Sequence, residues 1–524
     1  MSEVRVLDCT LRDGGYCNQW KFGYTEIGQI ISGLMQANIE IIECGFITNR
    51  VTYNKNVSKY SNLAQLEGII PVDKQGKLFV AMMNFGEFNV AELPICKDSL
   101  LDGIRVAFHK KDRYQALETC RILKEKGYKV FVQPMVSLSY SLEEFVGMIE
   151  IVNAFQPYAF YIVDSFGVMK AKELLRLYDL VSKHLMRDVI VGYHSHNNMQ
   201  LAFSNAQLLC AKADRDLILD SSIFGMGRGA GNLNTELFIE YANNNLQKQY
   251  QLNPLLEIID RVLVKFYKAN YWGYSLPNYL SASHNAHPNY AGFLDDKNTL
   301  TVKDMNRIFE MMSEEKKLEF DKEYIEALYS EYMNVGESQQ ENVEAFREAI
   351  KGKTVLLIAP GKSSLEEQDK IVCCMSDNQV VSISVNFHYA PMKTDYTFIS
   401  NLRRYRDLEL NDADRYIATS NIPAENVYLK VDYKVLLCEQ DAVADNAGLM
   451  LIKFLILCNC KQILLAGFDG YSHEDEENYA DRKLEIVSKN AVLDAINVGM
   501  NSVLSEYAKD VNIQFLTKQK HLKL

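Results

Sequence analysis

The stretch VRVLDCTLRDGG, Val4–Gly15, decides the fold of this chain. It begins with a short strand pattern, and charged residues follow it directly: Asp8, Arg12 and Asp13. An open doubly wound sheet usually places a glycine-rich fingerprint after its first strand. Because charged side chains stand there instead, the stretch favours a closed (β/α)8 barrel, in which the carboxyl ends of the strands form the functional face.

Strand patterns of the same kind recur through the first 225 residues. Short apolar, β-branched runs begin about 25–40 residues apart, with helical patterns between them in residues such as 26–36 and 114–126. Apolar strands that alternate with helices predict a parallel sheet covered on both faces. Eight units in about 250 residues fit a TIM barrel. The predicted strands are Val4–Leu7, Ile39–Glu43, Lys77–Met82, Gly103–Ala107, Lys129–Met135, Ala159–Val163, Val189–His194 and Leu217–Ser221.

Beyond the barrel the chain divides again. Residues 253–344 have a helical pattern, and the polar stretch Val335–Lys353 indicates the approach to a boundary. We therefore expect a barrel at 1–270, a helical extension at 271–350 and an α/β domain at 351–524. The last domain is predicted to be an open, Rossmann-like sheet.

Six strands and two long helices are predicted for that last domain. The helical patterns cover Ala442–Leu457 and Leu484–Tyr507. The strands alternate with helical patterns, which again indicates an α/β sheet. They are Thr354–Ile358, Val380–Val385, Tyr396–Ile399, Arg415–Ala418, Gln462–Ala466 and Ile513–Leu516.

Composition narrows the class of protein. The 524 residues carry 56 Lys plus Arg against 68 Asp plus Glu, a formal charge of −12, which argues against a nucleic-acid-binding surface. No run reaches the roughly 18 apolar residues that a membrane helix needs, and the N-terminus lacks a signal-peptide pattern. The 11 Cys stand without CxxC pairs, as expected of reduced thiols. We expect a cytoplasmic enzyme that binds neither nucleic acid nor membrane.

Residues that can bind a metal stand at two strand ends. His194 and His196 follow an apolar run, and residues i and i+2 of a strand point to the same side. Asp13 follows the first strand and offers a hard anionic ligand, with Arg12 beside it as a permanent cation. The alternatives are ordinary polar residues at a strand edge for the histidines and a surface turn with a salt bridge for RDGG.

A glycine-rich loop follows the eighth predicted strand. Glycines at positions 225, 227, 229 and 231 allow the backbone to wrap an anion before a helix begins. Asn232 in this loop can offer a neutral oxygen to a metal. The alternative is a flexible barrel loop.

Four fragments together resemble the DRE-TIM metallolyase superfamily. They are LDCTLRDGG, VDSFG, HSHNN and GMGRGAGNLNTE, in order at the predicted strand ends of about residues 1–290. The superfamily includes 4-hydroxy-2-oxovalerate aldolases, 3-hydroxy-3-methylglutaryl-CoA lyase, and isopropylmalate and citramalate synthases. The resemblance implies a TIM barrel and a divalent metal, Mn²⁺ or Mg²⁺.

The resemblance also implies roles for single residues. Asp13, His194 and His196 would be metal ligands, with Asn232 a further one, and Arg12 would stabilise an enolate. Glu43 and Asp164 would be pocket carboxylates at the ends of the second and sixth strands. The alternative for Glu43 is a structural partner of Arg12.

The aldolases within this superfamily are the best match, with one departure. VDSFGVM resembles their ADSGGAM, but Tyr16 stands where they carry an acid/base histidine. Tyrosine is a weak base at its ordinary pKa of about 10. Either Tyr16 acts with a lowered pKa, or another residue is the base, or the reaction differs. The stretch Tyr271–Tyr290 offers His287 and Tyr290 as other candidates. The alternative for that stretch is an aromatic helical layer that covers the barrel.

The C-terminal domain begins with a strand that runs into PGKSS. This segment faintly resembles Rossmann-type domains of the 6-hydroxymethylpterin diphosphokinase-like and bacterial glycosyltransferase kinds. Under that resemblance the domain binds a nucleotide or nucleotide-sugar through Gly361, Ser363, Ser364 and Asp469. The alternative is a structural or docking domain without catalysis.

The leading functional hypothesis is a metal-dependent aldolase or lyase that acts on a 4-hydroxy-2-oxo acid and releases pyruvate and an aldehyde. The alternatives are a Claisen-type condensation of an acyl-CoA with a 2-oxo acid, and a scaffold without turnover. The expected partner is a small-molecule 2-oxo acid substrate. A homo-oligomer and an aldehyde-processing partner protein are further candidates.

Overall fold

A computed structural model of the protein describes residues 2–333, 340–486 and 488–522. The chain forms two compact units. Unit 1 contains residues 1–291 and 314–320, and unit 2 contains residues 292–313 and 321–524. Residues of the expected helical extension fall in both units, and the three-part division at 270 and 350 stays a prediction. None of the described helices is both long and apolar enough to cross a lipid bilayer.

Unit 1 is a closed parallel barrel, as predicted. The strand order is β1-β9-β8-β7-β6-β5-β4-β2, and β1 pairs with β2 to close the ring. The short strand β3 (Lys59–Tyr60) pairs with the outer end of β2. The barrel strands are β1 (Val4–Asp8), β2 (Ile41–Ile47), β4 (Leu78–Asn84), β5 (Gly103–Phe108), β6 (Lys129–Pro134), β7 (Ala159–Asp164), β8 (Ile190–Ser195) and β9 (Leu217–Ser221).

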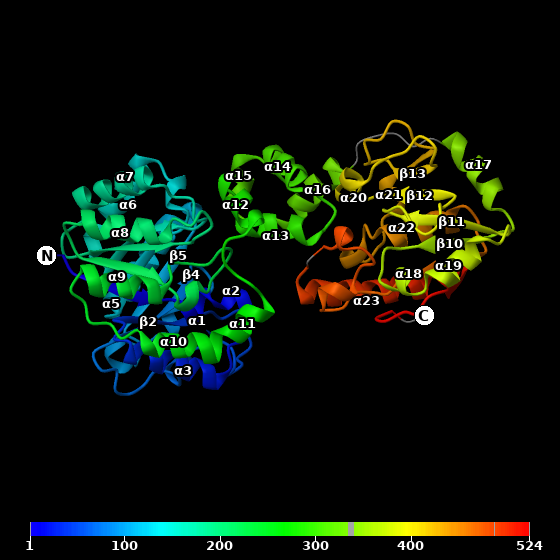
Figure 1. Ribbon diagram of the computed structural model, residues 1–524. Coiled ribbons are helices and arrows are strands. Elements are labelled where there is room, and N and C mark those ends of the chain that lie inside the picture. The colour runs from blue at the N-terminus through cyan, green and yellow to red at the C-terminus, as the bar shows by residue number, and fades with distance from the viewer. Residues whose placement is uncertain (1, 334–339, 487, 523–524) are drawn as a thin grey trace. The chain divides into compact units, whose positions relative to one another are not determined.

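Helices surround the barrel because its strands are apolar on both faces. Figure 1 shows α6, α7 and α8 on one side of unit 1 and α3 and α10 on the other. Ile30, Leu34 and Phe145 are among the helical side chains that pack onto the outward face of the strands. The main outer helices are α3 (Tyr24–Gln36), α4 (Leu63–Glu67), α5 (Arg113–Glu125), α6 (Leu142–Phe155), α7 (Ala171–His184), α8 (Ala202–Lys212), α9 (Thr235–Asn245), α10 (Asn253–Ile258) and α11 (Val264–Ala269).

The inside of the barrel holds a separate apolar cluster. Leu7, Val80, Phe131 and Ile218 are among its fully buried members. A filled interior is the normal state of an eight-stranded barrel, which is a packed core and has no pore. Polar side chains that could bind a ligand or a metal therefore lie at the strand ends. A few charged side chains also replace apolar ones within the strands.

One predicted boundary in unit 1 is wrong and matters for the site. The second strand was expected to end at Glu43, but β2 continues to Ile47. Its register shifts between Glu43 and Phe46, where Gly45 adopts a φ of +137°, and Phe46 then pairs with both β3 and β4. Glu43 therefore lies within the strand, deeper in the barrel than an end position.

Further helices follow the barrel along the chain. α12 (Leu276–Ser283) and α15 (Glu314–Lys317) belong to unit 1, and α14 (Val302–Met311) and α16 (Lys322–Tyr332) belong to unit 2. The helix α13 (Pro288–Asp296) contains the division between the units.

Unit 2 contains the predicted open sheet, and all of its strands are parallel. The order is β14-β13-β12-β11-β10-β15-β16. Successive strands thus run outward from β10 in one direction, and β15 and β16 return on its other side. The strands are β10 (Thr354–Ile358), β11 (Val380–Val385), β12 (Tyr396–Ile399), β13 (Tyr416–Thr419), β14 (Leu429–Val431), β15 (Gln462–Ala466) and β16 (Asn512–Phe515).

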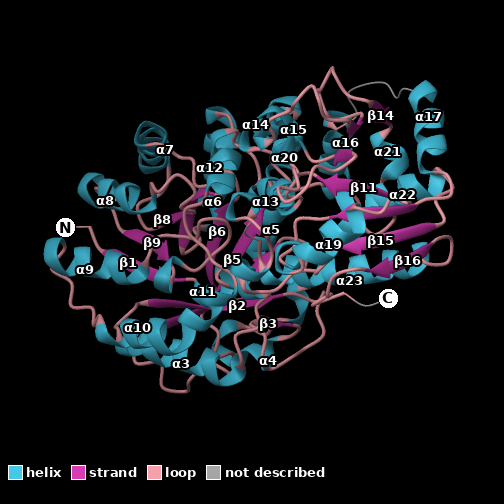
Figure 2. Ribbon diagram, turned by 45° about the vertical axis from the view of Figure 1, so that its right-hand side comes forward, coloured by secondary structure: helices cyan, strands magenta, loops and turns pink. Residues whose placement is uncertain are grey.

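Helices lie on both sides of the parallel sheet of unit 2, as Figure 2 shows. The sequence prediction missed β14, because three residues carry too little apolar pattern to be distinguished from a loop. The helices are α17 (Gln340–Ile350), α18 (Ser363–Glu366), α19 (Gln368–Met375), α20 (Leu402–Asp407), α21 (Tyr433–Leu436), α22 (Ala447–Leu457) and α23 (Asn490–Tyr507).

Two predicted helices begin later than expected. The pattern at Ala442–Leu457 becomes α22 only from Ala447, because the side chain of Asn446 accepts the N–H of Leu449 and caps the helix there. The pattern at Leu484–Tyr507 becomes α23 only from Asn490.

Candidate metal centre at the mouth of the barrel

Two strand ends bring the metal-ligand candidates together. The strand β1 ends at Asp8, and a short helix, α1 (Thr10–Asp13), turns Asp13 back over the barrel mouth. His194 is the second-to-last residue of strand β8. His196 is the first residue after this strand and forms an isolated β-bridge with Asn232. The i, i+2 spacing places both imidazoles on one side of β8, as expected from strand geometry.

Asp13, His194 and His196 form a buried triad. Each offers one ligand atom, and these atoms all lie within 4.8 Å of one another. The Nδ1 atom of His196 is 3.7 Å from the Oδ2 atom of Asp13, and it has no hydrogen-bond partner among the described residues. His194 donates its Nδ1–H towards Asp220, which leaves its other nitrogen as the ligand atom.

The ionisation of the triad suits a metal. Burial is the largest single influence on the pKa of Asp13 and raises it. The electrostatic effects of Arg12, the two histidines and Arg228 together outweigh burial and hold this pKa well below its usual range. Burial lowers the pKa of His196 to about 3. The site thus holds a carboxylate and a neutral imidazole, the forms that bind metals. The triad offers one carboxylate oxygen and two imidazole nitrogens. This ligand set suits a divalent transition ion and is compatible with Mn²⁺.

Asn232 is tied to the triad through its amide. Its Nδ2 atom donates to Asp13 Oδ2 at 2.7 Å, and its Oδ1 atom is buried without a partner among the described residues. The neighbouring Gly227 needs its small size, because a Cβ there would lie 2.3 Å from Asn232 Nδ2 and 2.6 Å from Asp13 Oδ2. The glycine-rich loop is therefore packed against the metal-ligand candidates.

Arg12 is held by two carboxylates and keeps one nitrogen free. Its Nε donates to Glu43 Oε2 at 2.9 Å and its Nη1 to Asp13 Oδ1 at 2.5 Å. Its Nη2 is buried and has no partner within the described part of the chain. These contacts match the alternative in which Glu43 is a structural partner of Arg12.

The sequence reasoning missed a buried charge network beneath the triad. Arg105 donates to Glu43 Oε2 at 2.8 Å and forms an ion pair with Asp220. Asp220 also accepts from His194 Nδ1 at 2.9 Å and from the hydroxyl of Tyr161 at 3.0 Å. The network links Arg12 to His194 through three fully buried charges. A signal was present, since Arg105 and Asp220 each interrupt an otherwise apolar strand run.

Arg228 of the glycine-rich loop and His287 lie beside the triad. Arg228 Nη1 is 3.2 Å from His287 Nε2, and Arg228 Nη2 is 3.4 Å from His196 Nε2. Burial lowers the pKa of His287 well below its usual value, and the charge of Arg228 lowers it further. The ring of Tyr16 lies 5.5 Å from the Arg228 guanidinium, and Tyr16 is 42% exposed. His287 and Tyr16 therefore both contact Arg228, which lies beside the triad.

Tyr290 and Asp164 have other contacts. The hydroxyl of Tyr290 donates to the carbonyl oxygens of Lys316 and Glu319, which holds the segment 314–320. The carboxylate of Asp164 accepts the N–H groups of Val168 and Met169 and so fixes the loop after β7, and burial raises its pKa to about 6. A catalytic role for Tyr290 stays a prediction.

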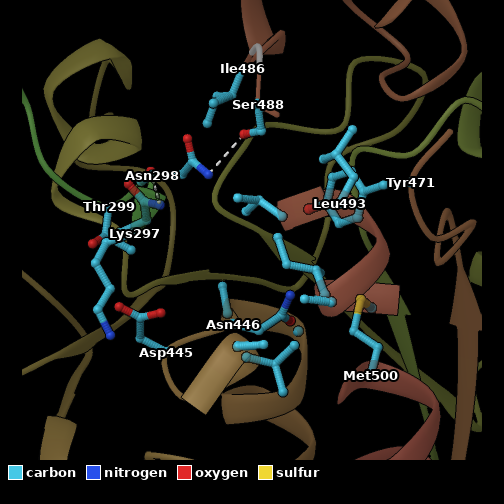
Figure 3. A pocket seen from close by; sticks show the side chains of 18 of the residues that line it. Lys297, Asn298, Thr299, Asp445, Asn446, Tyr471, Ile486, Ser488, Leu493 and Met500 are labelled. Carbon is cyan, nitrogen blue, oxygen red and sulfur yellow. Dashed lines mark hydrogen bonds between the residues drawn. The ribbon is translucent and has the colours of Figure 1, made fainter. Parts of the chain in front are cut away.

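Unit 2 holds a cavity of about 540 Å³ at the carboxyl ends of its strands. It lies beside β10 and β15, where the strand order reverses, which is where open α/β sheets bind ligands. Figure 3 shows Lys297, Asn298 and Asp445 on one side of this cavity and Leu493 and Met500 on the other. The cavity thus has a polar wall and an apolar wall.

Only two of the four residues expected to bind a nucleotide line this cavity. Gly361 and Asp469 line the cavity, and Ser363 and Ser364 do not. Ser363 donates both its backbone N–H, at 2.7 Å, and its hydroxyl to the carboxylate of Asp469. That carboxylate therefore takes the donors that a phosphate would need at the start of α18, and α18 is only four residues long.

Comparisons with known proteins concern the barrel. The HMGL-like family model matches residues 3–262, which include the triad and Arg12. A 4-hydroxy-2-oxovalerate aldolase of Pelotomaculum thermopropionicum is 27% identical over 239 residues, covering 45% of this chain and 69% of the relative. That of Carboxydothermus hydrogenoformans is 28% identical over 264 residues, covering 50% and 77%. The N-terminal domain of a Bacteroides vulgatus protein proposed to be an aldolase is 27% identical, with a TM-score of 0.47, covering 55% of this chain and 96% of that one.

Proposed function

Because residues 3–262 form an HMGL-like domain of the DRE-TIM metallolyase superfamily, we propose that this chain is a divalent-metal-dependent aldolase. Its reaction converts a 4-hydroxy-2-oxo acid into pyruvate and an aldehyde, or runs in reverse. The observation that carries the proposal is the buried Nη2 of Arg12, which has no partner among the described residues and belongs to a side chain bonded to Asp13 of the triad.

Asp13, His194 and His196 would hold the metal. Asn232 Oδ1, which is buried and has no partner among the described residues, is a further candidate oxygen. When bound, Mn²⁺ or Mg²⁺ supplies Lewis-acid stabilisation of negative charge on the substrate's oxygens. Asp220 fixes the ring of His194, since their hydrogen bond leaves only one nitrogen of that ring for a metal.

Arg12 contributes a fixed cation. Cleavage of the C3–C4 bond leaves its electron pair on the 2-oxo acid fragment, and the keto oxygen gains negative charge. Glu43 and Asp13 hold the guanidinium through Nε and Nη1, so Nη2 can donate to that oxygen without reorganisation. Loss of one such preorganised donor typically costs about 3–4 kcal/mol of transition-state stabilisation.

The proton of the 4-hydroxyl group needs a base, and its return to C3 of the enolate completes pyruvate. We assign this role to His287, whose ring lies beside Arg228 and is neutral because burial lowers its pKa. Tyr16 remains the second candidate, because its ring lies against the same guanidinium. His287→Gln with Tyr16 intact, and Tyr16→Phe with His287 intact, separate the two in the pyruvate assay below.

The test follows pyruvate release. Purified protein with Mn²⁺ or Mg²⁺ is given 4-hydroxy-2-oxo acids, and pyruvate is measured by coupled NADH oxidation. Release that Asp13→Asn abolishes, and that the surface variant Asp216→Asn leaves intact, supports the aldolase. Release of CoA from an acyl-CoA without pyruvate formation supports the condensing alternative. Failure to bind any divalent metal favours the scaffold.

We further infer that the cavity of unit 2 binds a nucleotide or nucleotide-sugar. Its place at the point where the strand order reverses supports this, as does its combination of an apolar wall with Lys297. Lys297 forms no ion pair with any described carboxylate and is 5.2 Å from the ring of Tyr329. Its ammonium group is therefore available to an anionic ligand.

Calorimetry with UDP, CMP, ADP and UDP-sugars tests this inference on the full chain. We expect micromolar binding of at least one of these ligands, and at least tenfold weaker binding to Lys297→Ala. Lys303→Ala is the control, since Lys303 does not line the cavity. Absence of binding by all the ligands would favour a structural or docking role for unit 2.

A further inference from the structure

Arg228 is a second guanidinium beside the triad. The loop after β9 carries it, and its backbone N–H lies 3.4 Å from Asp13 Oδ2. Its Nη2 donates to the carbonyl oxygen of Ser165 at 3.0 Å, and its Nη1 is 3.2 Å from His287 Nε2. The side chain is therefore held across the mouth of the site from the end of β7 to the segment after α12.

The charge of Arg228 differs from that of the two other arginines at the site. Arg12 forms ion pairs with Asp13 and Glu43, and Arg105 forms ion pairs with Glu43 and Asp220. No described carboxylate makes an ion pair with the Arg228 guanidinium, whose side-chain contacts are neutral groups. A partly buried cation that is held only by neutral groups keeps its charge available to a ligand.

Arg228 also keeps hydrogen-bond donors. Its Nε is buried and has no partner in the described part of the chain. A guanidinium has five N–H donors, and the fork of Nε and a terminal nitrogen matches a carboxylate or a phosphate. Arg228 is partly exposed as a whole but its Nε is buried, so an anion would meet this fork only by entering the site.

The loop holds this side chain in a fixed place. Gly227 and Gly229 flank it, and a Cβ at Gly229 would lie 2.6 Å from Asn198 Oδ1, while Gly229 itself adopts a φ of +66°. The Asn198 side chain also accepts the N–H of Ala230 at 2.7 Å. The backbone on both sides of Arg228 is therefore fixed against β8 and the loop that follows it.

We propose that Arg228 binds a second anionic group of the substrate, so that the substrate is a dianionic 2-oxo acid with a carboxylate or phosphate beyond the reacting carbons. The charges agree with this. The charges of Arg12, Arg105 and Arg228 balance those of Asp13, Glu43 and Asp220. A divalent ion would add two positive charges, and a dianion would neutralise them. The inference rests on the proposed aldolase function and specifies its substrate class.

Ligand pairs that differ only at the distal end test the proposal. Calorimetry on the Mn²⁺-loaded full chain compares 2-oxopentanoate with 2-oxoglutarate, and 2-oxohexanoate with 2-oxoadipate. A ligand with a distal phosphonate, 2-oxo-4-phosphonobutanoate, tests whether the second anionic group is a phosphate and not a carboxylate. We expect at least one of the dianions to bind at least tenfold more tightly than the 2-oxo acid of the same chain length that has no charge at its distal end.

Variants assign the preference to Arg228. Arg228→Gln should remove the preference and leave the dissociation constants of 2-oxopentanoate and 2-oxohexanoate within about twofold. Arg228→Lys, which keeps the charge without the fork, should retain part of it. Arg187→Gln, an exposed arginine paired with Asp214, is the matched control and should bind like the unmodified chain.

The failures are distinguishable. If the unmodified chain binds both members of each pair equally, or if Arg228→Gln weakens both equally, the Arg228 proposal is overturned and the aldolase proposal stands. If no 2-oxo acid binds the metal-loaded protein, both proposals fail together.

Discussion

Replacement of Asp220 by Asn should weaken metal binding and destabilise unit 1 at the same time. Asp220 is fully buried and forms three contacts: an ion pair with Arg105, a hydrogen bond of 2.9 Å with His194 and one of 3.0 Å from Tyr161. Asn keeps the shape but removes the charge, and its NH₂ group would face N–H donors. Among the residues that the structure describes, Arg105 would retain only Glu43 as a counter-ion.

Two magnitudes follow from these contacts. Breaking a buried ion pair from one side costs about 3–5 kcal/mol of stability. Loss of the carboxylate that orients a metal-binding histidine typically lowers metal affinity about 10–100-fold. The double variant Arg105→Met/Asp220→Asn should recover part of the stability, because it removes the uncompensated charge, but should not recover the metal affinity.

Two assays measure these effects separately. Mn²⁺ titration by electron paramagnetic resonance gives the affinity, and urea unfolding followed by tryptophan fluorescence gives the stability of unit 1, which contains both tryptophans, Trp20 and Trp272. The control is Asp216→Asn, whose long, partly exposed ion pair with Arg5 should contribute less than about 1 kcal/mol. Unchanged Mn²⁺ affinity in folded Asp220→Asn would refute the idea that this carboxylate orients His194.

Three further changes test other parts of the site. Gly227→Ala should reduce Mn²⁺ affinity at least tenfold, because its Cβ would displace Asn232 and Asp13, whereas Gly147→Ala on α6 has open space around its Cβ and should leave the affinity unchanged. The lowered pKa of His287 means that the unfolded chain binds a proton below pH 6.5 and the folded chain does not. The free energy of unfolding should therefore fall by up to about 1.4 kcal/mol per pH unit below pH 6.5 on account of this residue, and His287→Gln should remove that part of the slope in urea titrations at several pH values. Tyr161→Phe should lower stability by about 1 kcal/mol through the lost bond to Asp220, with Mn²⁺ affinity reduced less than in Asp220→Asn.

The sequence predicted the residues of the triad because local rules suffice for them. His194 and His196 share a side by the period of a strand, and the alternation of strands and helices puts Asp13 at the same mouth. It predicted Glu43 at the end of a strand, where the structure shows an interior position, because a register shift at Gly45 extends the strand past the point where the pattern stops.

The C-terminal unit shows the same limit. The strand that precedes PGKSS was predicted correctly, but the pairing of Ser363 with Asp469 joins residues 106 positions apart and depends on β10 lying next to β15. No local pattern contains that adjacency. The cavity beside these strands likewise exists only because the strand order reverses there.

By itself, the sequence determined the barrel, the order of its strands and three metal-ligand candidates, since periodicity and chain order can be read directly from the sequence. Only the tertiary structure decided how the charges are compensated. Arg105 meets Glu43 across 62 residues and Asp220 across 115, and Arg228 reaches His287 across 59. These pairs form because the barrel closes and brings strands and loops together in space, and the energies of buried charges depend on that closure.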